Sequence, residues 1–199
     1  MRIGVFGGTF DPPHVGHLIL AMEAVNQMHL DLVLWVLTPD PPHKSNWQIT
    51  PVEKRQVMLE AAIVGDPQFV LSRVDIDRPA PHYAVDTIRL LKTQYPNDSL
   101  VYLIGGDSLH DFPAWHDPVG LVSELDSIGV LRRPADDVDM SALEKVIPGL
   151  TSKTSFINAP QIEISGRVIR RLVASQLNYR YYLPPAVFTL VQQFKLYSG

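Results

Sequence analysis

The stretch GGTFDPPHVGHL, residues 7–18, gathers three glycines, two adjacent prolines, one aspartate and two histidines. Such a mixture suits neither a strand nor a core helix, so it predicts a turn. An apolar run at 2–6 precedes it, and apolar residues at helical spacing follow from Val15 to Val25. A strand, a turn and a helix in this order, repeated along a chain, indicate a parallel α/β sheet.

The rest of the chain repeats this alternation. Apolar, β-branched runs predict strands at 2–6, 32–37, 69–74, 100–105, 127–132 and, more weakly, 154–158. Helical spacing predicts helices at 15–29, 83–95, 165–175 and 184–197. Two capping boxes predict the starts of two more helices, one with Thr50 as N-cap and one at 141–144. Nearly continuous apolar strands are typical of a sheet covered on both faces. We therefore expect a doubly wound, mostly parallel α/β sheet in one domain over 1–199, with the helices from about 165 packed on it.

Composition narrows the function classes. The chain has 199 residues, 46% of them hydrophobic, and a formal net charge of −4, which argues against a general nucleic-acid binder. It has no cysteine, so disulfides, thiolate zinc sites and cysteine nucleophiles are excluded. The N-terminal sequence lacks a signal-peptide pattern, and no apolar run reaches the length of a membrane span. We expect a cytoplasmic protein without a membrane partner; the sequence leaves a homo-oligomer open.

The first turn is expected to bind an anion. In open α/β sheets, ligands bind beyond the carboxyl ends of the strands, where this turn lies. Gly7 and Gly8 would let backbone N–H groups approach a ligand, and the helix starting near His14 would add its free N–H groups and dipole. Phosphate is the obvious anion. The stretch matches neither the Walker A loop nor the dinucleotide-binding glycine pattern.

His14 and His17 are the unusual residues of this turn. Three residues apart on the first helical turn, they share one face and could donate N–H groups to phosphate oxygens. They could also be metal ligands, although no third ligand is evident, or ordinary surface or core histidines. The sequence does not fix their protonation. Asp11 is expected to be structural and to bond its own turn.

The stretch at 7–17 resembles the G-G-x-F-D-P-x-H-x-G-H signature of the HxGH nucleotidyltransferase superfamily, and ISGRVIR, 164–170, is similar to its second signature, I-S-S-T-x-I-R. Gly166 and Arg167 stand where that signature has Ser and Thr. Intermediate stretches resemble the bacterial nicotinate-nucleotide adenylyltransferase family: PPHK (41–44), HYAVDTI (82–88), LIGGDSLHDFPAWHD (103–117), RRP (132–134) and YYLPPAV (181–187). The resemblance spans essentially the whole chain and implies a Rossmann-like fold in which the two signatures meet at one sheet edge.

The resemblance implies transfer of the adenylyl group of ATP to nicotinate mononucleotide, with Mg²⁺ carried by ATP and no metal ligand from the protein. It implies the catalytic residues His14, His17 and Arg170. It implies ATP-binding residues Gly7, Gly8, Thr9, Phe10, His14, His17, Asp107, Arg133, Ser165 and Arg170. It implies mononucleotide-binding residues Lys44, Tyr83, Ala84, Trp115 and His116, with Trp115 stacking on the pyridine ring.

Each of these residues also has a plain structural interpretation. Lys44 could be an exposed loop lysine, Asp107 the N-cap of a short helix, and Trp115 a core residue, as Trp35 is expected to be. Ser165 could be only a helix cap, and Arg170 a surface ion-pair partner. The alternatives for function are another adenylyltransferase, acting on nicotinamide mononucleotide or phosphopantetheine, and a catalytically silent nucleotide-binding regulator on the same fold.

Overall fold

A parallel sheet organises the chain. The computed structural model describes residues 1–40, 49–132, 138–160 and 164–198. Within these ranges six strands form one sheet in the order β3-β2-β1-β4-β5-β6, and every pairing is parallel. The strands are β1 Arg2–Gly8, β2 Leu32–Leu37, β3 Phe69–Ser72, β4 Ser99–Gly105, β5 Ser127–Arg132 and β6 Thr154–Asn158. The predicted doubly wound α/β fold is confirmed, and strand order reverses beside β1.

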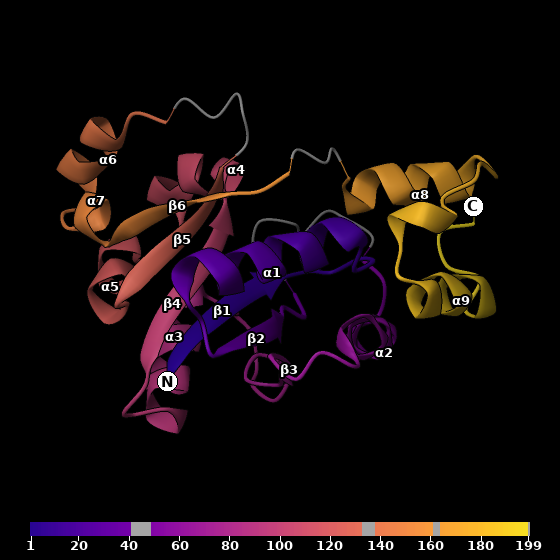
Figure 1. The fold of residues 1–199 in the computed structure, drawn as a ribbon, viewed down its shortest axis with the longest axis horizontal. Helices are drawn as coiled ribbons and strands as arrows, with labels where there is room; N and C mark the ends of the chain where they lie inside the picture. Colours follow the sequence, from indigo (N-terminus) through magenta and orange to yellow (C-terminus); the bar gives the residue numbers. More distant parts are fainter. Residues whose placement is uncertain (41–48, 133–137, 161–163, 199) are drawn as a thin grey trace.

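Helices cover both faces of this sheet (Figure 1). They are α1 Val15–Met28, α2 Val52–Ile63, α3 Ala84–Gln94, α4 Gly106–His110, α5 Pro118–Glu124, α6 Met140–Val146, α7 Leu150–Lys153, α8 Gly166–Ala174 and α9 Pro185–Gln193. Side chains of α1 and α2 pack on one face around Trp35, which is fully buried as expected. Side chains of α3, α4 and α5 pack on the other face around Val5 and Ile104. No helix in these described ranges is long and apolar enough to cross a membrane.

The C-terminal helices pack on α2 rather than on the sheet. Figure 1 shows α8 and α9 grouped beyond α2, at the end of the molecule away from α6 and α7. Met58 of α2 joins Ile169 of α8 and Val187 of α9 in one buried apolar cluster. Leu196, near the end of the chain, belongs to the same cluster. This packing holds α8 and α9 against α2.

Two helix starts differ from the sequence predictions. Pro51, and not Thr50, is the N-cap of α2, because Thr50 is bound elsewhere: its N–H donates to Asp11 and its carbonyl accepts from Arg55. The expected capping box at 141–144 is also wrong. Asp139 caps α6, accepting 3.0 Å hydrogen bonds from the N–H groups of residues 141 and 142. The predicted last helix, 184–197, is shorter, because α9 ends at Gln193.

Candidate functional site

The turn between β1 and α1 lies at the carboxyl edge of the sheet. Phe10 takes a left-handed backbone conformation (φ 47°), and its ring packs 5.6 Å from Phe6 and 5.3 Å from Trp35 between centroids. A Cβ on Gly8 would lie 2.9 Å from that ring, so glycine makes room for it. Phe10 is 2% exposed. Its ring therefore belongs to the core, which leaves only its backbone for a contact to ATP.

The two histidines of the turn are arranged as a stacked pair. His14 is the N-cap of α1, and its ring lies 3.6 Å from that of His17 between centroids, at 22°. The N–H of His14 donates to Nδ1 of His17 at 3.1 Å. That bond needs an unprotonated Nδ1, so a neutral His17 carries its proton on Nε2. Burial lowers the pKa of His14 to about 4, and this residue is therefore neutral at pH 7.

The second signature meets the first, as the resemblance implied. Nη1 of Arg170 donates to the carbonyl oxygen of Asp11 at 2.5 Å. A Cβ on Gly166 would lie 2.7 Å from the same oxygen, so this close approach explains a glycine where the signature has Ser. Ser165 caps α8 as predicted, its Oγ accepting from the N–H of Val168 at 3.3 Å.

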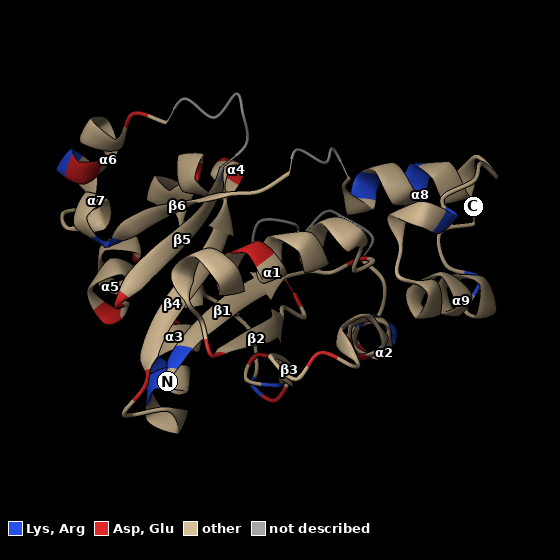
Figure 2. Ribbon diagram, in the orientation of Figure 1, with Lys and Arg blue, Asp and Glu red and all other residues tan. Residues whose placement is uncertain are grey.

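Helix α8 presents a positive surface beside the turn. Its residues 166–174 include three arginines and no acidic residue, and Figure 2 shows Lys and Arg colour along it without Asp or Glu colour. Arg167, which stands at the signature's Thr, is exposed, while Arg170 is half-buried. The helix thus adds cationic side chains to its own dipole at this edge of the sheet. Both features favour an anion.

A cavity of about 860 Å³ opens on the other side of the turn. Its lining joins residues that the sequence assigned to two different substrates: Gly7, Gly8 and Thr9 for ATP, and Tyr83, Ala84, Trp115 and His116 for the mononucleotide. A cavity of this size is within the usual range for small-molecule sites. His14, His17, Ser165 and Arg170 do not line it and lie toward α1 and α8. These candidate phosphate contacts therefore lie next to the cavity lining and not in it.

Aromatic rings form one wall of the cavity. Trp115 is half-buried, neither core nor fully exposed, and packs 5.0 Å from Phe112 and 6.2 Å from Tyr102 between ring centroids. The ring of His116 stacks on that of Tyr83 at 3.9 Å and 18°. Trp115 follows the short 3₁₀ turn Phe112–Ala114, in a segment of short helices between β4 and α5. This wall is apolar and flat-faced, as a heteroaromatic ring requires.

The sequence did not single out the polar floor of this cavity. The buried carboxylate of Asp75 accepts from Oγ1 of Thr87 at 2.8 Å and from Nε of Arg78 at 2.9 Å. His82, also buried, and Tyr102 complete the floor; burial, followed by the charge of Asp75, raises the pKa of Tyr102. The stretch 82–88, which resembles the family, contains two of these residues, His82 and Thr87, and could have indicated them.

Asp107 and Asp11 differ in structure from what the sequence predicts. Asp107 lies in the first turn of α4, whose N-cap is Gly105, so Asp107 as N-cap is wrong. Asp11 is structural, but it bonds distant residues rather than its own turn: its oxygens accept from the N–H of Thr50 and from the hydroxyl of Tyr197. Both oxygens are thereby occupied. Lys44 and Arg133 lie outside the described residues.

The described side chains do not form a group that could hold a metal ion. In the described parts of the chain, no three His, Asp or Glu side chains are placed to share a metal ion. The turn offers N–H donors and imidazoles, and its one carboxylate, Asp11, is already hydrogen-bonded. Divalent magnesium prefers oxygen ligands and commonly binds through substrate phosphates. The described residues therefore do not fit a metal ion held by the protein alone.

Comparisons with known proteins agree with this geometry. The cytidylyltransferase-like family model matches residues 5–172. A Thermomicrobium roseum protein named "Probable nicotinate-nucleotide adenylyltransferase" is 41% identical, covering 98% of this chain and 91% of its own length. The nicotinate-nucleotide adenylyltransferase of Bacillus subtilis is 38% identical, covering 100% and 99%.

A solved structure shows the same fold. The nicotinic acid mononucleotide adenylyltransferase of Plasmodium falciparum, complexed with NaAD, superposes with a TM-score of 0.77 at 20% identity and covers 98% of this chain and 97% of that one. At that identity the match speaks for the fold alone. The full-length matches at 38–41% identity speak for the family. The chain belongs to the cytidylyltransferase-like family and, within it, to the nicotinate-nucleotide adenylyltransferases.

Proposed function

We propose that this protein transfers the adenylyl group of ATP to nicotinate mononucleotide, giving nicotinate adenine dinucleotide and pyrophosphate. One observation carries the proposal: the glycine turn and the aromatic wall line a single cavity. Two nucleotides bound at these places would meet beside the start of α1. Family membership supports the same reaction, and a solved relative of the same fold is a complex with NaAD.

The chemistry requires alignment and charge stabilisation. A phosphate oxygen of the mononucleotide attacks the α-phosphorus of ATP, a new P–O bond forms, and the bond from that phosphorus to the bridging oxygen breaks. The electron pair leaves with pyrophosphate. Because the attacking oxygen is already anionic, no general base is needed, and positioned donors carry the catalysis.

We assign the phosphate contacts to the side of the turn that faces α1 and α8. His17 would donate its Nε2–H to a phosphate oxygen, since Nδ1 is already bonded to the N–H of His14. Arg170 and the N-terminus of α8, beginning at Ser165, would hold the outer phosphates. Asp107 would accept from a ribose hydroxyl. Gly7, Gly8 and Thr9, with Arg133 beyond the described ranges, complete the proposed ATP site.

Mg²⁺ would arrive with the triphosphate. The described residues do not fit a metal held by the protein alone, so we expect substrate phosphates and water to supply its ligands. When bound, the ion neutralises charge on the phosphates. Every other contact proposed here belongs to residues of this chain.

The mononucleotide would occupy the aromatic end of the cavity. Trp115 would stack on the pyridine ring, His116 would flank it, and Lys44 would bind its phosphate. Tyr83 and Ala84 are the N-cap and first residue of α3, where backbone N–H groups have no partner within the helix. Such donors suit a carboxylate, which only accepts hydrogen bonds. An amide would place its NH₂ against them, so the site should prefer nicotinate to nicotinamide.

A pyrophosphate assay tests the proposal. The protein is incubated with Mg-ATP and, separately, nicotinate mononucleotide, nicotinamide mononucleotide or phosphopantetheine, and pyrophosphate release is measured. We expect the highest kcat/KM with nicotinate mononucleotide. Faster turnover with nicotinamide mononucleotide would contradict the substrate choice. ATP binding without pyrophosphate release from any acceptor would identify a silent nucleotide-binding protein instead.

A further inference from the structure

A buried arginine outside the cavity ties together the ends of two strands. Arg55 of α2 is 1% exposed, and its guanidinium donates to four backbone carbonyl oxygens. Nε bonds Thr50 at 2.7 Å, and Nη2 bonds Pro39 at 2.7 Å. Nη1 bonds both Thr9, at 3.0 Å, and Thr38, at 2.9 Å. One nitrogen thus joins the residue after β1 to the residue after β2.

These bonds fix a spacing that matters for the two substrates. Thr9 begins the proposed ATP turn, and Thr38 begins the connection that carries Lys44. A guanidinium presents its N–H groups in a rigid planar fork, so the four carbonyl bonds leave little freedom to the residues that they join. Burial lowers the pKa of Arg55, and the charge of Asp11 opposes that shift. Arg55 is thus a cation held among backbone oxygens beside one buried carboxylate.

The end of the chain holds the same turn from the other side. The hydroxyl of Tyr197 donates to Oδ1 of Asp11 at 2.5 Å, while Oδ2 accepts from the N–H of Thr50 at 3.2 Å. The carbonyl of Asp11 accepts from Arg170. Burial, followed by the charge of Asp11, raises the pKa of Tyr197, so its hydroxyl stays a donor. Leu196, buried in the cluster around Met58, anchors this tail.

We propose that Arg55 and Tyr197 are positioning residues for adenylyl transfer, which hold the β1–α1 turn in register with the β2 end and with α8. The inference rests on the proposed function and extends it to two residues that touch neither substrate cavity nor reacting atoms. In-line attack needs the two phosphates aligned, and a displacement of about 1 Å can cost about 100-fold in rate. Loosening the turn should therefore lower kcat more than it raises either KM.

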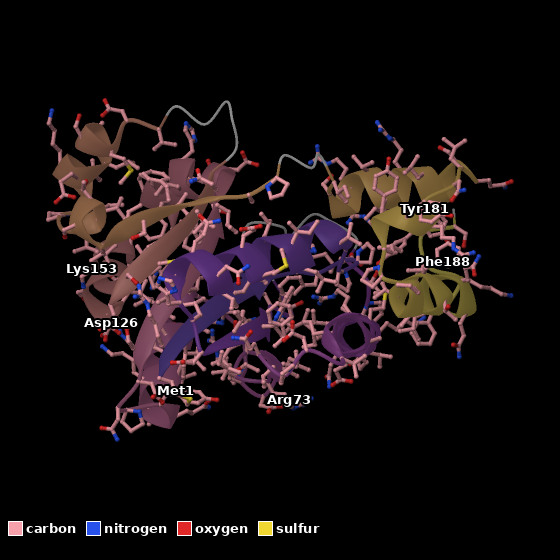
Figure 3. All side chains as sticks on the ribbon, in the orientation of Figure 1. Met1, Arg73, Asp126, Lys153, Tyr181 and Phe188 are labelled. Carbon is pink, nitrogen blue, oxygen red and sulfur yellow. The ribbon has the colours of Figure 1, made fainter. Side chains whose placement is uncertain are left out.

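The sharpest test is Tyr197→Phe, which removes one hydroxyl and no ring. Tyr181→Phe is the matched control, because Tyr181 lies in the same C-terminal part and is 85% exposed (labelled in Figure 3). We measure kcat, KM for each substrate, thermal unfolding, and amide hydrogen exchange of residues 7–18. We expect Tyr197→Phe to lower kcat about 10-fold, to change both KM values less than about 3-fold, and to speed exchange at 7–18. Tyr181→Phe should match the unsubstituted protein.

Arg55→Lys tests the other side of the turn. Lysine keeps the charge but loses the planar fork, so the four carbonyls cannot all stay bonded. The control is Arg73→Lys, since Arg73 is half-exposed and pairs with Asp77 at the surface (labelled in Figure 3). We expect Arg55→Lys to lower kcat per folded molecule about 100-fold, and Arg73→Lys to leave it unchanged. If Arg55→Lys fails to fold, Tyr197→Phe decides.

Two results would overturn the proposal. The first is an unchanged kcat in folded Tyr197→Phe and Arg55→Lys; the second is a loss of kcat that only follows the unfolded fraction of each variant. The proposed function can fail separately: the unsubstituted protein would then release no pyrophosphate with any acceptor. In that event amide hydrogen exchange of residues 7–18 decides. Faster exchange in Tyr197→Phe but not in Tyr181→Phe supports the positioning role of Tyr197, and equal exchange in the two variants refutes it.

Discussion

The β1–α1 turn beside the cavity and the aromatic wall of the cavity are built in different ways. On the turn side, Asp11, His14 and Arg55 are buried, at 7%, 5% and 1% exposure, and each is held by hydrogen bonds to atoms of the turn or its neighbours. On the aromatic side, Trp115 is half-buried and His116 is exposed, and their contacts are ring packing. One side is rigid and polar, while the other is apolar and open.

This difference follows the chemistry proposed for each side. Charge that develops on a phosphate is stabilised best by donors already in place, because no reorganisation is then needed during the reaction. A pyridine ring needs only a flat apolar surface, and stacking tolerates small changes of orientation. Substitutions on the turn side should therefore affect kcat, and substitutions on the aromatic side should affect KM for the mononucleotide.

His17→Ala should have the largest effect. It removes the Nε2–H donor that the bond from the N–H of His14 to Nδ1 orients. Loss of one preorganised donor typically costs about 10²–10³ in kcat. Pyrophosphate release under saturating substrates measures it, with His29→Asn as control because His29 is an exposed C-cap in the left-handed region that asparagine tolerates. A kcat equal to that of the unsubstituted protein would refute the phosphate role of His17.

The pH dependence of stability tests whether the His14 side chain is shielded from water in the folded protein. Burial lowers the pKa of His14 to about 4 from 6.5. Between these values the unfolded chain binds a proton that the folded chain does not, so the free energy of unfolding falls as the pH drops from 6.5 to 4, by about 3 kcal/mol at pH 4. Urea unfolding at pH 7, 5.5 and 4.5 measures this against His14→Gln. A constant difference between the two proteins across this range would show that His14 titrates normally.

Trp115→Ala should act on the aromatic side alone. Loss of a stacking side chain costs about 1–3 kcal/mol per base, or about 5- to 150-fold in KM for nicotinate mononucleotide. We expect kcat and KM for ATP to change less than about 3-fold, and Trp115→Phe to restore most of the affinity. Steady-state kinetics with each substrate varied in turn distinguish these parameters. A rise in KM for ATP alone would place Trp115 at the wrong nucleotide.

The sequence predicted the sheet well because its information is local. Continuous apolar runs mark buried parallel strands wherever they occur, and all six strands were found at or near their observed bounds. That the two signatures meet was implied by the family resemblance, and the hydrogen bond from Arg170 to the carbonyl oxygen of Asp11 confirms it. The cavity lining combines residues from several strand ends, because parallel strands end at one edge of the sheet. Residues 7–9 lie at the end of β1, and residues 83–84 and 115–116 lie in the connections that follow β3 and β4.

Contacts between a side chain and a distant backbone were not predictable. The sequence did not single out Arg55, because nothing in a sequence marks the carbonyls of Thr9 or Thr38 as its acceptors. Asp11 is 186 residues from Tyr197. Thr50 carries a good capping signal, yet tertiary bonds to Asp11 and Arg55 use its backbone instead. At Thr50, long-range hydrogen bonds therefore override the local preference for a helix cap.

Ser165 should give the smallest effect and the finest distinction. Its Oγ caps α8, so Ser165→Ala should lower stability by about 1 kcal/mol, measured by urea unfolding. That loss alone would not tell a cap from a phosphate ligand. Ser165→Asp does, because aspartate caps as well as serine, while its charge would repel a triphosphate at the N-terminus of α8. A stable Ser165→Asp with a raised KM for ATP would extend the rigid polar turn side to α8. An unchanged KM for ATP would show that the triphosphate does not contact the N-terminus of α8, and would leave α1 and its histidines as the phosphate-binding groups.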